Sequence, residues 1–178
     1  MTSIGDAMPT FRLPDTQGEF HEPGGAAATV IVFTCNHCPY ALAWHDRLVA
    51  LARDYADRDV RVLAINSNDE TIQPGDSLDA MAQRVRDGEF GPIPYLRDES
   101  QDVARTFGGK TTPDVFIVDA DLRLRYRGAP DDDHDDPAQE AKHLRDALDA
   151  ILAGADPAVP ETPPVGCTIK WTDRQNPN

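Results

Sequence analysis

Two cysteines three positions apart, Cys35 and Cys38, carry the clearest chemistry in the sequence. They follow a run of apolar, β-branched residues and come just before Pro39, which suits the first turn of a helix because that position needs no N–H partner. The start of a helix carries unpaired N–H groups and partial positive charge, which stabilise a thiolate. Only a thiolate attacks a disulfide or a peroxide, and a second cysteine one turn away can attack the mixed disulfide. The pattern predicts thiol–disulfide chemistry, provided that solvent reaches both sulfurs.

The residues beside the cysteines are expected to tune them. Asn36 and His37 lie between the two, and Thr34 directly precedes Cys35. A protonated His37 would place positive charge beside the Cys35 thiolate, stabilise the reduced form and make the pair a better oxidant. We therefore predict a Cys35 pKa below that of a free cysteine and a reduction potential between about −270 and −120 mV.

Metal binding is the main alternative for the pair. Cys35 and Cys38 could be two ligands, with His37 or Cys167 added. Structural zinc usually has a second Cys/His pair at similar spacing, which the sequence lacks. The run Asp131–Asp136 also suggests a cation site, but it lacks the glycine and the spacing of a calcium loop, so a solvated loop is favoured. We expect no metal and no cofactor.

The third cysteine, Cys167, has two interpretations. It is either a third redox thiol that folds back to the pair or a small apolar residue that packs the carboxyl-terminal segment. Its neighbours Gly166, Ile169 and Trp171 indicate a segment that docks on the protein. The sequence leaves both interpretations open.

The elements that must position the pair follow an alternating order. Apolar runs predict buried strands at 26–33 and 60–65. Between them, Trp44, Leu48 and Leu51 recur at helical spacing. A strand, a helix and a strand in this order form a βαβ unit with a parallel strand pair.

Further elements flank this unit. Hairpins are predicted from residues 11–21 and 115–126, where short apolar runs surround Pro, Asp and Gly turns. Three more helices are predicted: one near 78–85 begun by Asp76 or Ser77, a short one capped by Ser100, and one near 144–152 that Gly154 ends. We expect one domain over residues 1–154 and a proline-rich tail over 155–178 that packs on it.

Composition limits the partners and the location. The 178 residues carry a net charge of −14 and a pI of about 4.5, which argues against nucleic acid or an anionic membrane as partner. Residues 1–8 show no signal-peptide pattern, and no run of eighteen apolar residues occurs. The few cysteines are unevenly placed, so we expect a cytoplasmic protein.

Several segments resemble a known family. Residues 5–15 resemble the amino-terminal signature of the redoxin branch of the thioredoxin-like superfamily, and residues 33–40 look like the active-site segment of its peroxiredoxin-like thioredoxin-family proteins. Thr112-Pro113 is similar to the cis-proline loop of thioredoxin folds, and residues 165–171 resemble the carboxyl-terminal segment of that subfamily. The resemblance covers residues 5–171.

The resemblance implies an α/β thioredoxin fold, a central mixed β-sheet flanked by helices with an amino-terminal β-hairpin extension. It implies that Cys35 is the attacking thiol and Cys38 the resolving thiol of a redox-active disulfide. Thr112 and Pro113, joined by a cis bond, would lie against the pair and hold an incoming chain by backbone pairing. The implied partners are a protein disulfide or a hydroperoxide as substrate and an external thiol or thioredoxin-type reductant.

The sequence departs from the family pattern at two points, and these departures rank the candidate functions. Peroxiredoxins place a threonine three residues before the peroxidatic cysteine, whereas Thr34 directly precedes Cys35. Thioredoxins carry a buried acid in the strand before the pair, which residues 26–33 lack, so His37, Glu99 or water must move the proton. We therefore predict a thiol–disulfide oxidoreductase. The alternatives are a peroxiredoxin-like antioxidant peroxidase and a copper(I)-binding thioredoxin-fold protein.

Overall fold

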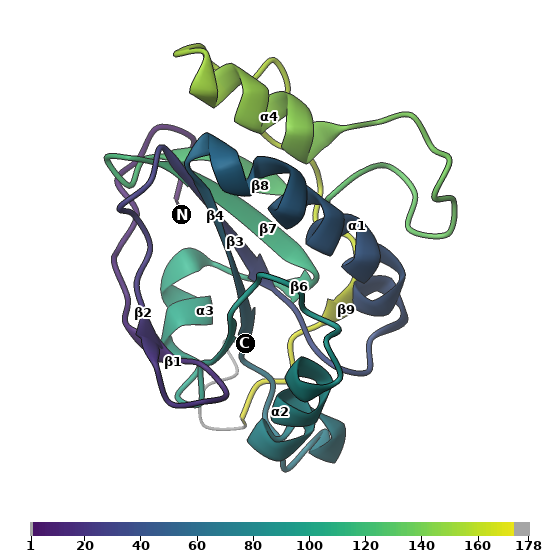
Figure 1. Ribbon diagram of the computed structural model, residues 1–178. Coiled ribbons are helices and arrows are strands. Elements are labelled where there is room, and N and C mark those ends of the chain that lie inside the picture. The colour runs from purple at the N-terminus through teal and green to yellow at the C-terminus, as the bar shows by residue number, and fades with distance from the viewer. Residues whose placement is uncertain (1, 173–178) are drawn as a thin grey trace.

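A five-stranded mixed sheet forms the centre of the protein in the computed structural model, which describes residues 2–172 (Figure 1). The strand order is β5-β4-β3-β7-β8. Their bounds are β3 (Ala28–Phe33), β4 (Val60–Asn66), β5 (Tyr95–Arg97), β7 (Asp114–Asp119) and β8 (Leu124–Gly128). β3 pairs in parallel with β4 and antiparallel with β7, so it lies in the middle of the sheet.

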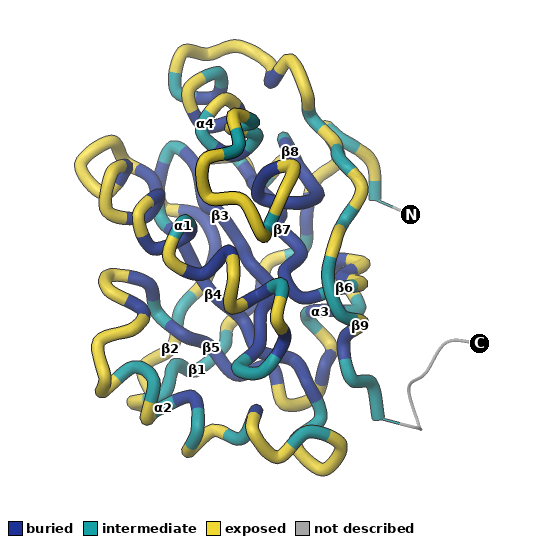
Figure 2. Tube along the Cα trace, turned by 90° about the vertical axis from the view of Figure 1, so that its right-hand side faces the viewer, coloured by how far each residue is buried: buried dark blue, intermediate teal, exposed yellow. Residues whose placement is uncertain are grey.

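The apolar sequence of β3 explains its central place. All six of its residues are buried, as a strand covered on both faces requires (Figure 2). In the register of the sheet, Phe33 lies opposite Ile65 on one side and Asp114 on the other. The chain that follows Phe33 therefore starts from a fixed point, and that chain carries the cysteine pair.

Helices cover both faces of the sheet. Their bounds are α1 (Pro39–Tyr55), α2 (Leu78–Arg86), α3 (Asp102–Phe107) and α4 (His143–Leu152), with short 3-10 turns η1 (Ala56–Arg58) and η2 (Pro74–Asp76). Val30 and Val32 point into the core shared with α1 and α4. Ile31 and Phe33 point to the opposite side, where Phe107 of α3 packs. The predicted helical face of α1 is confirmed, because Trp44 and Leu51 are among its buried residues.

Two small strand pairs lie outside the main sheet. β1 (Leu13–Pro14) and β2 (Phe20–His21) form the predicted amino-terminal hairpin. β6 (Thr111–Thr112) pairs antiparallel with β9 (Cys167–Thr168), which belongs to the carboxyl-terminal segment (Figure 1). The mixed sheet, the flanking helices and the hairpin confirm the predicted fold class.

Of the two caps predicted for α2, Asp76 and Ser77, the structure confirms Ser77, because its side chain accepts a hydrogen bond from the Ala80 N–H. The predicted cap of α3 was wrong. At the start of α3, the N–H groups of residues 103 and 104 donate to the Asp98 carboxylate, while Ser100 accepts only from Asp102. Leu78, the first residue of the predicted helix at 78–85, is 45% exposed and does not join its buried face. In each case the amino acid type was suitable, and tertiary contacts decided between neighbours.

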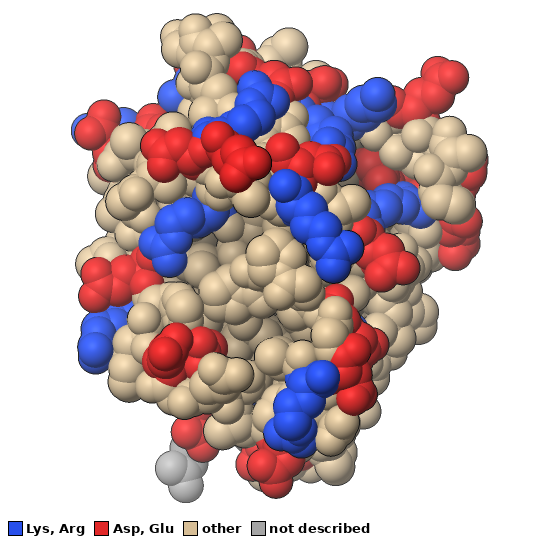
Figure 3. Space-filling view, in the orientation of Figure 1, with Lys and Arg blue, Asp and Glu red and all other residues tan. Residues whose placement is uncertain are grey.

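Charged side chains of both signs cover the molecule. Figure 3 shows Lys and Arg side chains lying among the carboxylates on one face, around a centre without charged groups. Within residues 2–172, no helix combines the length and apolarity needed to cross a bilayer.

Candidate active site

The cysteine pair lies where β3 passes into α1. Thr34 is buried, and its N–H donates to the Ile65 carbonyl at 2.8 Å, which extends the contact of β3 with β4. Cys38 directly precedes Pro39, the exposed first residue of α1. The Cys38 N–H points back to Cys35 and donates to its Sγ at 3.4 Å. The predicted juxtaposition of two sulfurs and a helix start is therefore present.

Thr112 contacts both sulfurs. Its hydroxyl Oγ1 lies 3.3 Å from Cys35 Sγ, and its carbonyl oxygen lies 3.1 Å from Cys38 Sγ. The bond between Thr112 and Pro113 is cis, as the resemblance implied. Thr112 thus forms one site with the pair, although it lies 77 positions from Cys35 and 74 positions from Cys38 in the sequence.

Both sulfurs are covered, contrary to the expectation that solvent reaches them. Cys35 is 1% exposed and Cys38 is 0% exposed. They form a small cluster with Ala41, and the half-buried side chains of Tyr40 and Cys167 pack against it. The prediction of open access was wrong because it considered only the strand and the helix, and not the segments that lie over them.

The pKa values of the two thiols are shifted in opposite directions. A hydrogen bond between the two thiols is the largest cause, because it raises the pKa of Cys35 and lowers the pKa of Cys38 to about 4. Burial and the nearby Asp76 carboxylate raise the pKa of Cys35 further, outweighing the hydroxyl of Thr112. The predicted low pKa of Cys35 is therefore wrong for the closed, reduced arrangement.

Asp76, which the sequence suggested as a helix cap, holds the loop between the cysteines. Its carboxylate is fully buried and accepts the Asn36 N–H at 2.6 Å. The side-chain amides of Asn66 and Asn68 donate to the same carboxylate at 3.0 and 2.9 Å. His37 Nδ1 lies 2.7 Å from Asp76 Oδ2, within the distance of an ion pair.

The side chain of Asn36 fastens the same loop on its other side. Its Oδ1 accepts from the Tyr95 hydroxyl at 2.7 Å and from Arg84 Nη1 at 3.0 Å, and its Nδ2 donates to the Gly75 carbonyl at 2.9 Å. α2 supplies Arg84 and β5 supplies Tyr95. None of these three partners of Asn36 was predicted from the sequence, because no local pattern links them to the cysteines.

Cys35, His37 and Asp76 bring ligand atoms within 4.8 Å of one another, a spacing that could hold a metal ion. The amides and the His37 contact already engage both Asp76 oxygens, which explains the cluster as a hydrogen-bonded support for the loop. The set also differs from the two cysteines and one histidine of the copper(I) alternative, since it contains Asp76 in place of Cys38.

A second buried acid, Asp114, lies beside the end of β3. It is the register partner of Phe33 on β7 and is 0% exposed. Burial raises the pKa of Asp114 to about 6, and its Oδ2 accepts from the Lys110 N–H at 3.0 Å. The sequence analysis looked for a buried acid in β3 alone, and here the neighbouring strand carries one. Glu99, the other acid considered, is exposed and lines a separate surface pocket.

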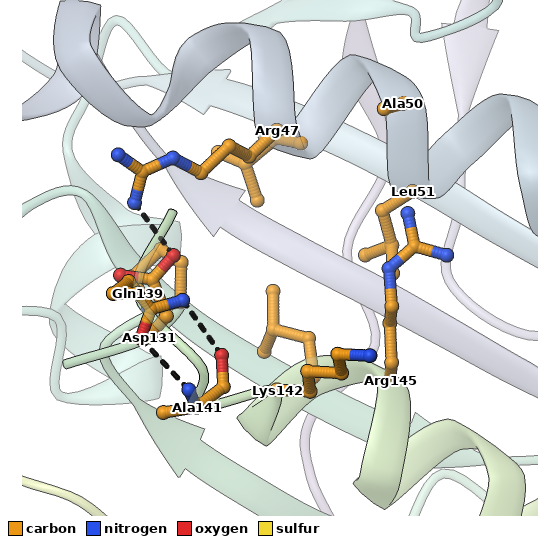
Figure 4. A pocket seen from close by; sticks show the side chains of 11 residues that line it. Arg47, Ala50, Leu51, Asp131, Gln139, Ala141, Lys142 and Arg145 are labelled. Carbon is orange, nitrogen blue, oxygen red and sulfur yellow. Dashed lines mark hydrogen bonds and ion pairs between the residues drawn. The ribbon is translucent and has the colours of Figure 1, made fainter. Parts of the chain in front are cut away.

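A surface pocket lies apart from the sulfurs. It encloses about 360 Å³ between α1 and the start of α4, with Lys142 and Arg145 on one side and Arg47 turned toward Asp131 on the other (Figure 4). Its wall includes Asp131, whose carboxylate accepts from Trp44 Nε1 and from Arg47, both at 2.7 Å. These bonds tie α1 to the loop after β8, so the pocket wall helps to hold the helix that begins at the cysteines.

Cys167 lies directly against the pair. In the β6–β9 ladder it is the register partner of Thr112. Its side chain packs on the cysteine cluster and hydrogen-bonds with Cys38. Burial and then this bond raise the pKa of the Cys167 thiol to about 11.

Comparisons with known proteins agree with the fold. The family model described as Redoxin matches residues 3–146. The hypothetical protein SMc02350 from Sinorhizobium meliloti 1021 is 35% identical with a TM-score of 0.89, covering 97% of each chain. An uncharacterized conserved protein from Geobacillus kaustophilus is 38% identical with a TM-score of 0.89, over 97% of this chain and 94% of that one.

A more distant structure shares the fold. Peroxidoxin BcpB from Mycobacterium tuberculosis is 20% identical with a TM-score of 0.62, over 86% of this chain and 96% of that one. A search among curated proteins found no match.

Proposed function

The chain belongs to the Redoxin family and has a thioredoxin fold, and on this basis we propose that it is a thiol–disulfide oxidoreductase whose working groups are Cys35 and Cys38. The observation that carries the proposal is the closed pair at the start of α1, where the Cys38 N–H donates to Cys35 Sγ at 3.4 Å. A helix start stabilises the thiolate that the reaction requires.

In the reductive direction, Cys35 attacks one sulfur of a substrate disulfide, and the other substrate sulfur leaves as a thiolate that takes up a proton. The Cys38 thiolate then attacks Cys35, which releases the second substrate thiol and leaves a Cys35–Cys38 disulfide. An external thiol or a thioredoxin-type reductant returns two electrons to this bond.

The contacts of the pair support Cys35 as the attacking sulfur although its pKa is raised and that of Cys38 is lowered. A proton can pass along the hydrogen bond between the two thiols, which moves the charge to Cys35. Cys38 can then donate its proton to the Thr112 carbonyl at 3.1 Å. The Cys35 thiolate keeps two donors, the Cys38 N–H and the Thr112 hydroxyl. Both sulfurs therefore have hydrogen-bond partners, whichever of the two carries the proton.

Reduction of cystamine, a small cationic disulfide suited to an acidic protein, tests the proposal, with insulin as a second substrate and dithiothreitol as reductant. Wild type is expected to exceed dithiothreitol alone, and Cys35→Ser is expected to lose at least about a hundredfold in kcat/KM. Asp79→Asn, an exposed change in α2, is the control and should keep full activity. Activity that survives in Cys35→Ser would remove the assignment.

A thiol peroxidase is the second candidate, and the burial of both sulfurs favours it, because a hydroperoxide is small enough to enter where a protein is not. A thiolate would attack the peroxide oxygen, giving a sulfenic acid and an alcohol or water, and the other thiol would condense with it and release water. Stopped-flow mixing with hydrogen peroxide decides. A rate no faster than that of a free thiol of matched pKa excludes this function.

We place this activity in the cytoplasm, where a reducing environment returns such pairs to the dithiol form. The few, unevenly placed cysteines support this location.

A further inference from the structure

The carboxyl-terminal segment is built to hold Cys167 at the active site. β9 pairs with β6 so that Cys167 lies opposite Thr112, the residue that contacts both Cys35 and Cys38. A Cβ atom at Gly166 would lie 2.2 Å from the Thr112 carbonyl oxygen, so the close approach of the two strands requires glycine at this position.

Contacts after Cys167 fix the segment further. The Lys170 N–H donates to Asn68 Oδ1 at 2.8 Å, and the Lys170 carbonyl accepts from Gln101 Nε2 at 2.8 Å. Ile169 is 2% exposed and packs in the core beside α3. Backbone, polar and apolar contacts all support one placement of the Cys167 sulfur.

Access differs among the three thiols. Cys35 and Cys38 are buried, whereas Cys167 is only half-buried. Cys167 packs on the cysteine cluster, and of the pair it is the Cys38 sulfur that lies beside it. Of the three, Cys167 is the thiol that an external reductant can reach from outside.

We propose that Cys167 is a third redox thiol that exchanges with Cys38. The inference rests on the proposed function, because it begins from the Cys35–Cys38 disulfide. The Cys167 thiol loses its proton and its sulfur attacks Cys38; the Cys38–Cys167 bond forms, the Cys35–Cys38 bond breaks, and the Cys35 thiolate that leaves takes up a proton. No net oxidation occurs, since one disulfide replaces another. An external thiol then reduces the more accessible Cys38–Cys167 bond.

The electrostatics of the site favour this exchange once the pair is oxidised. Besides burial, the bond to Cys38 and the negative charge of Cys38 raise the pKa of Cys167, while Lys170 lowers it. Both contributions come from the Cys38 thiolate and end when Cys38 enters a disulfide with Cys35. Oxidation of the pair therefore makes Cys167 easier to ionise at the moment when its attack is needed.

Disulfide mapping tests the proposal. Reduced protein is treated with one equivalent of diamide, quenched with acid, alkylated and digested with trypsin. Cys35 and Cys38 lie together in the peptide 13–47, and Cys167 lies in the peptide 146–170, so a Cys38–Cys167 bond appears as a linked pair of peptides. Wild type should give linked peptides beside the internal Cys35–Cys38 product. Cys35→Ser should keep the link, and Cys38→Ser should lose it by at least about tenfold.

Two variants of the segment separate exchange from packing. Gly166→Ala should lower the linked product by about tenfold while the Cys35–Cys38 bond still forms, because the added Cβ moves β9 away from Thr112. Val165→Ala, an exposed change one position earlier, is the control and should match wild type. In Cys167→Ser, reduction of the oxidised protein by glutathione should slow about tenfold, since the reductant must reach a buried bond.

The outcomes distinguish this inference from the proposed function. Cystamine reduction and a Cys35–Cys38 bond without any linked peptides would overturn the role of Cys167 and leave the oxidoreductase intact. Loss of cystamine reduction in wild type would overturn the proposed function itself. Equal glutathione rates for wild type and Cys167→Ser would assign Cys167 to packing alone.

Discussion

The Asp76 carboxylate lies 2.7 Å from His37 Nδ1 and so reaches between the two cysteines from outside the strand and helix that carry them. The same carboxylate accepts the Asn36 N–H, so one buried acid holds both residues of the intervening loop. Asp76 thereby fixes the loop between the cysteines, and the negative charge of its carboxylate acts on Cys35. The geometry of the pair depends on this residue as much as on the cysteines.

Replacing Asp76 should separate its charge from its hydrogen bonds. Asp76→Ala leaves the buried amides of Asn36, Asn66 and Asn68 without their acceptor and should cost about 2–4 kcal/mol in the free energy of unfolding. Asp76→Asn keeps one acceptor oxygen and should cost less, while lowering the pKa of Cys35 because the charge is gone. Urea unfolding and thiol titration measure the two effects. Asp79→Asn should leave both unchanged, and an equal loss in that control would make the effect of Asp76 non-specific.

Thiolate absorbance against pH should show one cysteine that stays ionised to low pH. Because the pKa of Cys38 is lowered to about 4, the absorbance of reduced wild type should fall with a midpoint near this value. Cys38→Ser should abolish the transition, and Cys35→Ser should raise its midpoint because the donor thiol is lost. A low midpoint that persists in Cys38→Ser would instead place the charge on Cys35.

The same group should make stability depend on pH. The folded-state pKa of Cys38, about 4, lies below its ordinary value of 9.0, so the thiolate contributes stability that is complete above pH 9 and lost as pH falls toward 4. Thermal unfolding measures this effect. The difference in stability between the reduced wild type and Cys38→Ser should shrink as pH falls over this range. A constant gap would contradict the lowered pKa.

Asp114→Asn should stabilise the protein near neutral pH. The pKa of Asp114 is raised from 3.8 to about 6, so its ionisation costs stability above pH 6 and costs nothing below 3.8. The free energy of unfolding of the variant should exceed that of wild type by about 1–3 kcal/mol at pH 7, and this difference should vanish as pH falls toward 4. Asp119→Asn, at the other end of β7, loses the bond to Arg125 and should not stabilise. A pH-independent difference would argue against a buried ionised carboxylate.

Thr112→Val should slow the attack by Cys35 while sparing the fold. The change removes the hydroxyl 3.3 Å from Cys35 Sγ and keeps the carbonyl that faces Cys38. Loss of about 1 kcal/mol of thiolate stabilisation corresponds to roughly a fivefold lower kcat/KM for cystamine. Thr111→Val removes a neighbouring hydroxyl that bonds the Pro113 carbonyl and is the matched control. Equal losses in both variants would indicate a general disturbance of β6.

The pattern of the sequence was sufficient for the framework of the site. The β-branched run of β3, the helical spacing in α1 and the position of Pro39 depend on local preferences, and they correctly placed Cys35 and Cys38 at the junction. The cis bond before Pro113 was also foreseen, from the resemblance to thioredoxin folds.

The same patterns do not predict which residues surround the cysteine pair or how its pKa values are shifted. Asp76 has the composition of a helix cap, and only tertiary packing shows that Ser77 takes that role and frees Asp76 for the loop. The low pKa of Cys38 depends on the relative positions of three sulfurs, two of which are more than a hundred residues from the third in sequence. Long-range placement, and not residue type, determined these features.

The pairing of β9 with β6 also bears on which disulfides the protein can select. Because β9 belongs to the same chain, an extended polypeptide that seeks the β6 edge competes with a tethered strand whose effective concentration is on the order of millimolar. Unfolded or weakly held polypeptides lose that competition at ordinary cellular concentrations. For the proposed oxidoreductase, we therefore expect the carboxyl-terminal strand to select against random protein disulfides.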